Sequence, residues 1–213
     1  MDNKDYTNII LEIFQEICKI PHPSGQEEAI GDYLMAFAKA HGLKAKKDNV
    51  GNILICKAAA KGCEKSPTVI LQAHQDMVCE KDAALIHDFM KQPIQTYIED
   101  GWLKAKGTTL GADDGIGMAM MLAVLADSTL KHGPIEALFT VSEETGLTGA
   151  SNLGDDMING SMLINLDSED EGEIFIGCAG GIKSEIAFHY NAESIPENSF
   201  FLKISVDRLH GGH

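Results

Sequence analysis

The chain has 213 residues, enough for one large domain or for one domain and part of a second. Its 44% hydrophobic and 23% charged residues are typical of a soluble, globular protein. Lys and Arg number 17 against 32 Asp and Glu, giving a formal net charge of -15 that repels a phosphate backbone and argues against nucleic acid as a partner.

The sequence offers no sign of a membrane or of an oxidising compartment. Residues 1–6 contain no apolar signal core, and no stretch approaches the roughly 20 apolar residues of a membrane span. The five cysteines are odd in number and lack paired close spacing, which favours reduced thiols over a disulfide framework or a zinc knuckle. We therefore expect a cytoplasmic protein with no membrane partner.

Two helices are predicted at the N-terminus. Apolar residues recur at helical spacing over 9–17, and the prolines at 21 and 23 end that helix. Residues 24–27, Ser-Gly-Gln-Glu, have the spacing of a capping box for a second helix, which ends at Gly42. His22 lies in the turn between the helices, and we expect it to be structural.

The pattern then changes to that of strands. Residues 50–56 and 68–73 are short apolar runs, rich in β-branched residues and flanked by Gly or Pro, which predicts two central strands. Residues 94–99 and 102–105 alternate around Asp100-Gly101, which predicts a hairpin.

The following segments alternate between helix and strand. Residues 115–126 predict a buried helix, 135–141 a strand, the region of Ser151 a short helix, and 162–166 another strand. Such alternation indicates an α/β fold, with a mostly parallel or mixed sheet and helices on both faces. Ligands of such folds bind beyond the carboxyl ends of the strands.

A change of pattern after Gly180-Gly181 suggests a second domain. Residues 183–190 and 200–206 are alternating runs separated by a polar turn. We therefore expect one domain over 1–182 and the opening of a second over 183–213.

Imidazole and carboxylate groups stand where the predicted strands end or where the buried helix begins. They are His74, Asp76, Asp113, Glu143, Glu144 and Asp167. Each has an ordinary explanation alone: an Asp pair caps a helix, a Glu pair is surface charge, and His-x-Asp is a surface hydrogen bond. Together they are the donors that zinc accepts, so they predict a metal centre.

The chemistry of a two-metal site suggests a role for several of these residues. Metals about 3.5–4 Å apart need a bridging carboxylate, which Asp113 could supply. Asp76 could hold the second nitrogen of His74, as carboxylates do in many zinc sites. Consecutive side chains leave the backbone in different directions, so one of Glu143 and Glu144 could bind metal while the other acts as a base.

The motifs that contain these residues resemble those of the co-catalytic di-zinc exopeptidases, which include aminoacylases, carboxypeptidases, tripeptidases and aminoacyl-histidine dipeptidases. In order they are His74-Gln-Asp-Met-Val78, Thr109-Leu-Gly-Ala-Asp-Asp-Gly-Ile-Gly117, Ser142-Glu-Glu-Thr-Gly146 and Asn165-Leu-Asp-Ser168. Residues 71–81 and 111–117 are most similar to the aminoacyl-histidine dipeptidases, also called peptidase D or carnosinase-like enzymes. The resemblance covers essentially the whole chain.

The resemblance implies a role for each site residue. His74 and Asp167 would hold one zinc, Asp113 would bridge, and Glu144 would hold the second zinc. Glu143 would be the general base and Asp76 would orient His74. Two zinc ions would occupy the complete site, with cobalt or manganese as substitutes. The peptide bond between Asp113 and Asp114 would be cis.

Two departures from the family pattern concern the second metal and the second domain. The family's second zinc takes a histidine from near the end of a chain more than twice as long, and this sequence has no such residue. Gly211-Gly-His213 resembles the opening of the lid or dimerisation domain, where His213 would help to stabilise the tetrahedral intermediate. We therefore expect an N-terminal fragment that is inactive alone.

The expected function is zinc-dependent hydrolysis of dipeptides, including aminoacyl-histidines, by a full-length protein that is a homodimer. A tripeptidase or an N-acyl amino acid deacylase would use the same metal residues. A different class of function is a metal-binding fragment without turnover, and a third is an acidic interaction domain without metal. Metal analysis and a panel of small peptides distinguish these alternatives.

Overall fold

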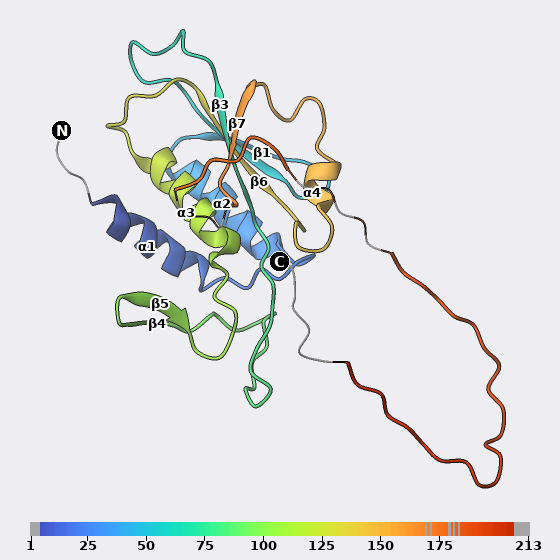
Figure 1. Cartoon of the computed structure of the whole chain (residues 1–213). Coiled ribbons are helices and arrows are strands. Elements are labelled where there is room, and N and C mark those ends of the chain that lie inside the picture. The colour runs from blue at the N-terminus through green and yellow to red at the C-terminus, as the bar shows by residue number, and fades with distance from the viewer. Residues whose placement is uncertain are drawn as a thin grey trace. The chain divides into compact units, whose positions relative to one another are not determined.

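The computed structural model describes residues 5–168, 170, 172–178, 180, 182 and 184–206. The chain divides into two units, Met1–Glu171 and Gly172–His213 (Figure 1). Within the part of the chain that the structure describes, no helix is both long and apolar enough to cross a membrane. Every helix and strand that follows belongs to the first unit.

A mixed sheet of five strands forms the centre of the first unit, in the order β1-β2-β6-β3-β7. The strands are β1 (Lys44–Lys47), β2 (Ile53–Lys57), β3 (Val69–His74), β6 (Ile135–Thr140) and β7 (Met162–Asn165). β3 runs parallel to both β6 and β7, whereas β2 is antiparallel to β1 and β6. The α/β fold and its mixed sheet are therefore as predicted.

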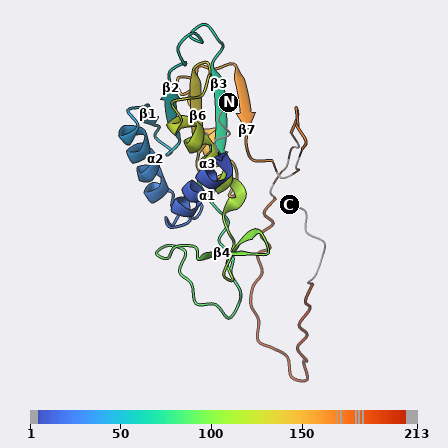
Figure 2. The same ribbon diagram turned by 90° about the vertical axis from the view of Figure 1, so that its left-hand side faces the viewer.

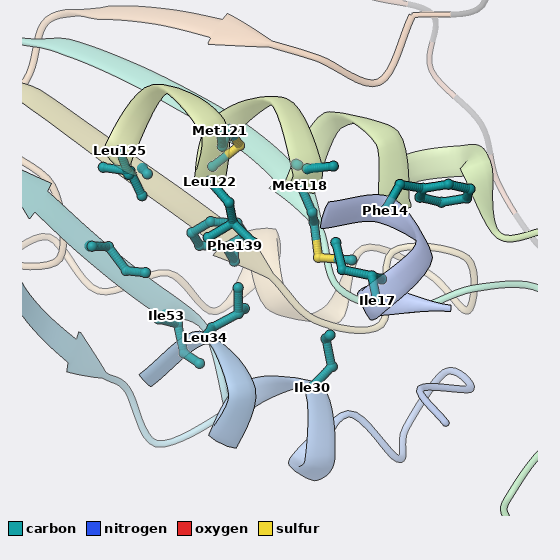
Figure 3. Close-up of a cluster of buried hydrophobic side chains, with 14 of the residues drawn as sticks. Phe14, Ile17, Ile30, Leu34, Ile53, Met118, Met121, Leu122, Leu125 and Phe139 are labelled. Carbon is teal, nitrogen blue, oxygen red and sulfur yellow. The ribbon is translucent and has the colours of Figure 1, made fainter. Parts of the chain in front are cut away.

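Three helices share one side of this sheet (Figures 1 and 2). They are α1 (Tyr6–Ile17), α2 (Glu28–Ala40) and α3 (Ala112–Ala126). α3 lies at the centre of the apolar core, where Met118, Met121 and Leu122 are fully buried (Figure 3). This burial explains why the residues of α3 are apolar on every side.

The opposite side of the sheet has a smaller core. Leu54, Ile70 and Leu138 project from three neighbouring strands and pack with Met157. Met157 belongs to the segment that follows the one-turn helix α4 (Thr148–Ser151). The predicted short helix near Ser151 is confirmed.

The predicted hairpin is also confirmed. β4 (Thr96–Glu99) pairs antiparallel with β5 (Trp102–Ala105). The two residues between them, Asp100 and Gly101, have φ angles of 52° and 81°. Positive φ at both central positions is the type I′ geometry that matches the twist of paired strands, and Asp-Gly adopts it readily.

The predicted capping box at Ser24 and Glu27 is wrong. Glu27 is the N-cap residue of α2, but its side chain makes no capping hydrogen bond. Ser24 Oγ donates instead to Asp76 Oδ2 at 2.7 Å, and Glu27 Oε1 accepts from Ser142 N at 2.9 Å. Long-range partners have therefore replaced the local ones that the spacing predicts.

The alternating runs of the second unit form no strands in the described residues. Neither 184–190 nor 200–206 has extended pairing, and the described residues of this unit contain no other strand. A strand needs a hydrogen-bonded neighbour, so alternation of side chains alone does not form one. Many of the large apolar side chains of these runs, such as Phe188 and Phe201, are exposed.

Gly149 in α4 allows the closest backbone approach beside the sheet, which predicts a large loss of stability for Gly149→Ala. A Cβ there would lie 2.4 Å from Asn52 Oδ1 and 2.5 Å from Val141 N, and backbone atoms cannot move aside cheaply. We expect a loss of about 3 kcal/mol in the free energy of unfolding, the upper end of the usual cost of overpacking. Urea unfolding would measure this loss.

Gly177→Ala is the control. At Gly177 a Cβ meets open space, so this substitution should change the free energy of unfolding by less than about 0.5 kcal/mol. Equal effects at the two positions would contradict the steric explanation.

Candidate metal centre

The ends of three parallel strands bring the candidate residues together. His74 is the last residue of β3, Glu143 and Glu144 follow β6, and Asp167 follows β7. His74 pairs with Thr140 of β6, and Gln72 pairs with Asn165 of β7, so the three strands end at the same edge of the sheet. The start of α3 adds Asp113 to this edge, since Asp113 Oδ1 lies 2.9 Å from His74 Nε2.

His74 is completely buried, and its two ring nitrogens have different surroundings. Nδ1 lies 2.8 Å from the backbone oxygen of Asp76 and 3.4 Å from its carboxylate oxygen Oδ1. Nε2 faces two other carboxylates, with Asp113 Oδ1 at 2.9 Å and Asp167 Oδ2 at 3.9 Å. Asp76 thus contacts the nitrogen that points away from Asp113 and Asp167, and its carbonyl is closer than its carboxylate.

Asp76 also contacts the segment that contains the two glutamates. Its Oδ1 accepts from Glu143 N at 2.9 Å, and its Oδ2 accepts from Glu144 N at 3.3 Å. Burial alone would raise the pKa of Asp76, but hydrogen bonds from His74, Ser24 and Glu143 lower it to about 2. Asp76 is therefore ionised and holds two segments of the site in register.

Asp113 and Asp114 open α3 with non-helical backbone angles, and the peptide bond between them is cis. The side chain of Asp113 is 43% exposed, whereas Asp114 is buried. Asp114 Oδ2 accepts from the backbone nitrogen of His74 at 3.3 Å. The two neighbouring carboxylates thus contact different parts of His74, one its ring and the other its backbone.

Glu143 and Glu144 line different hollows beside the site. Glu144 and Asp113 line one of about 280 Å³, together with Val78 and Leu110. Glu143 and Asp167 line a smaller one of about 90 Å³. The two glutamates therefore border different hollows, although a carboxylate oxygen of each lies within 4.8 Å of the other.

Burial and neighbouring charges shift the pKa values of several groups in the site. Burial alone would lower the pKa of His74, but its contacts with Asp76, Asp113 and Asp167 raise it to about 10. Burial raises the pKa of Asp114 to about 7, and the charges of Asp167 and Asp113 add to this effect. Burial and the charge of Asp113 also raise the pKa of Asp167 and of Glu144. A bound cation would reduce the electrostatic repulsion among these carboxylates.

Two groups of side chains have the spacing of metal ligands. His74, Asp113 and Asp167 form one group, and His74, Glu143 and Glu144 form the other, with ligand atoms within 4.8 Å of one another in each. Imidazole nitrogen and carboxylate oxygen are ligands of zinc, and the first group would leave one position of a tetrahedral ion open. The donor set therefore fits zinc.

The structure brings together six of the seven residues predicted for the site, and the seventh, His213, lies outside the described residues. Two buried acids near the site were not predicted for it, Asp114 and Glu27. Asp114 stands beside Asp113 in the motif, which is a signal in itself. Glu27 gave no such signal, because its spacing from Ser24 is that of a capping box.

Several known proteins similar to this chain are peptidases. The sequence model of Peptidase family M20/M25/M40 matches residues 70–206. The cytosol non-specific dipeptidase of Escherichia coli (strain K12) is 50% identical over 202 residues, which are 95% of this chain and 42% of that protein. The chain thus spans less than half the length of this relative.

Solved structures are similar as well. The aminoacylhistidine dipeptidase from Vibrio alginolyticus has a TM-score of 0.75 and 50% identity, with 76% of this chain and 33% of that chain covered. A tripeptidase from Staphylococcus aureus has a TM-score of 0.65 and 26% identity, with 76% of this chain and 44% of that chain covered.

Proposed function

We propose, from the premise that this chain belongs to Peptidase family M20/M25/M40, that it carries most of the zinc centre of a dipeptidase. The observation that carries this proposal is the group formed by His74, Asp113 and Asp167, with the two glutamates beside it. The 50% identity to the cytosol non-specific dipeptidase of Escherichia coli supports a dipeptide as substrate and the cytoplasm as location.

Each residue of the centre has a proposed role. His74 and Asp167 would hold one zinc, Asp113 would be a ligand shared by both, and Glu144 would hold the second zinc. Zinc bound by these residues would supply a water molecule of lowered pKa and polarisation of the scissile carbonyl. Glu143 takes the proton of the attacking water and passes it to the leaving amine. Glu143 borders the hollow that Asp167 lines and Glu144 the one that Asp113 lines, which supports this division of roles.

Asp76 orients the centre without contacting the substrate. Its carbonyl and carboxylate hold Nδ1 of His74, so that Nε2 faces Asp113 and Asp167. The same carboxylate holds the backbone of Glu143 and Glu144. Such support of a ligand is typical of zinc sites, where an outer carboxylate fixes the tautomer and direction of a histidine.

A substrate panel tests the proposal. The full-length, zinc-loaded protein should hydrolyse unblocked dipeptides, aminoacyl-histidines among them, with a kcat/KM at least ~10-fold above that for tripeptides or acetylated amino acids, about the discrimination that a small difference in substrate size gives. A chelator should abolish the hydrolysis, and added zinc should restore it. Preference for tripeptides or for acetylated substrates would identify a tripeptidase or a deacylase instead. Binding of zinc without hydrolysis would favour a non-catalytic metal-binding protein.

A further inference from the structure

A turn far from the metal-binding motifs in the sequence holds the segment that contains the glutamates. The turn comprises residues 22–27, between α1 and α2, and we call it the clamp turn. Its backbone pairs with the segment after β3, because Met77 N donates to the backbone oxygen of His22 at 3.2 Å. Its side chains reach two segments of the site, Ser24 the carboxylate of Asp76 and Glu27 the residue Ser142. The clamp turn therefore connects the segments after β3 and β6.

Glu27 is the main contact between the clamp turn and the glutamate segment. Its Oε1 accepts from Ser142 N and from Ser142 Oγ, both at 2.9 Å, and also from Gly25 N at 2.9 Å. Glu27 is only 9% exposed, so these hydrogen bonds to a carboxylate are shielded from water. Hydrogen bonds with one charged partner are about twice as strong as neutral ones. Such a buried acid is well suited to fix the position of Ser142.

The segment that Glu27 holds has an unusual backbone. Ser142 has a φ of 50°, in the left-handed region that residues other than glycine rarely adopt. The backbone N–H groups of Ser142, Glu143 and Glu144 all donate to carboxylates, the first to Glu27 and the next two to Asp76. Three consecutive donors held by two buried acids fix the direction in which both glutamates leave the backbone.

We propose that Glu27 and Ser24 are positioning residues of the hydrolytic site, an inference that rests on the proposed function. Glu27 fixes the left-handed turn at Ser142 and so aims Glu143 and Glu144, while Ser24 holds Asp76 Oδ2 toward the same segment. Neither residue touches the substrate. Their effect reaches the reaction through the placement of the base and of one metal ligand, and a displacement of about 1 Å in such groups costs up to ~10²-fold in rate.

Substitution of Glu27 in the full-length, zinc-loaded protein tests this inference. Glu27→Ala should lower kcat by ~10- to 10²-fold, with KM within about threefold of wild type and zinc content unchanged. Glu27→Gln keeps an oxygen that accepts the same hydrogen bonds, so it should remain within about fivefold of wild type. The matched control is Glu28→Ala, which removes an exposed charge from the next residue. It should leave kcat, KM and zinc content unchanged.

Amide hydrogen exchange gives a second readout that does not depend on turnover. In Glu27→Ala the amides of residues 142–144 should exchange at least ~10-fold faster, while those of the central strands keep their wild-type rates. A residue that only capped α2 would lower stability as a whole, without a local change at 142–144 or a loss confined to kcat. Normal kcat and normal exchange in a folded Glu27→Ala protein would overturn the proposal.

Two further outcomes are distinguishable. If Glu27→Ala does not fold, Ser24→Ala removes only the contact with Asp76 and should still lower kcat by at least ~3-fold at unchanged KM; no change would overturn the proposal. If the wild-type protein binds zinc but hydrolyses no dipeptide, the proposed function fails. Faster exchange confined to 142–144 in Glu27→Ala would then still support the positioning role, and unchanged exchange would overturn it.

Discussion

Glu143→Gln is expected to lower the kcat of the full-length, zinc-loaded protein by ~10²- to 10⁴-fold, the range for loss of a general base. The amide of Gln has nearly the shape of the carboxylate, but it cannot take a proton from water. The backbone N–H of residue 143 still donates to Asp76 Oδ1, so the fold of the segment should persist. Zinc content should equal that of the wild-type protein, and metal analysis of the purified variant would measure it.

Glu144→Gln is the matched control, because it makes the same change at the neighbouring residue. Removal of a ligand should lower the zinc content and, through it, the activity. Both glutamates lie within ligand distance of His74, so their roles depend on this comparison. Loss of zinc in Glu143→Gln with retention in Glu144→Gln would exchange the two roles.

The sequence predicted those features that arise from local patterns. The alternation at 94–105 and the Asp100-Gly101 turn specify the hairpin, and the apolar run of α3 specifies a buried helix. Acidic residues directly after apolar runs predicted that these side chains lie together, because parallel strands place their carboxyl ends at one edge. β1 was not predicted. Three of its four residues are lysines, so its sequence lacks the apolar pattern of a strand.

Features that depend on contacts between distant residues were not predictable. The spacing of Ser24 and Glu27 is compatible with a local cap, yet their partners are Asp76 and Ser142, 52 and 115 residues away. A partner at that separation leaves no periodic signal in a single sequence. The contact of Asp114 was not predictable either, because its buried carboxylate accepts from the backbone nitrogen of His74, 40 residues away, although its place beside Asp113 in the motif is a signal.

Asp113→Asn is expected to weaken zinc binding by more than ~10²-fold, which exceeds the 10- to 100-fold typical of residues that only support a ligand. Asp113 Oδ1 lies 2.9 Å from His74 Nε2. The substitution therefore removes a charged ligand from the group formed by His74, Asp113 and Asp167. If Asp113 bridges, the second zinc loses the same donor. Zinc titration against a competing chelator would measure the affinity, and the zinc-induced rise in Tm should disappear with it.

Asp114→Asn provides the control, because it makes the same replacement of a carboxylate by an amide at the adjacent residue. The Asn oxygen can still accept from the backbone nitrogen of His74, which lies 3.3 Å from Asp114 Oδ2 in the wild-type protein. Zinc affinity should therefore fall by about 10-fold, as for a supporting residue. A larger loss in Asp114→Asn than in Asp113→Asn would mean that the buried carboxylate is the ligand. Because Asp113 contacts the ring of His74 and Asp114 its backbone, the pair of variants tests which of the two carboxylates binds the metal.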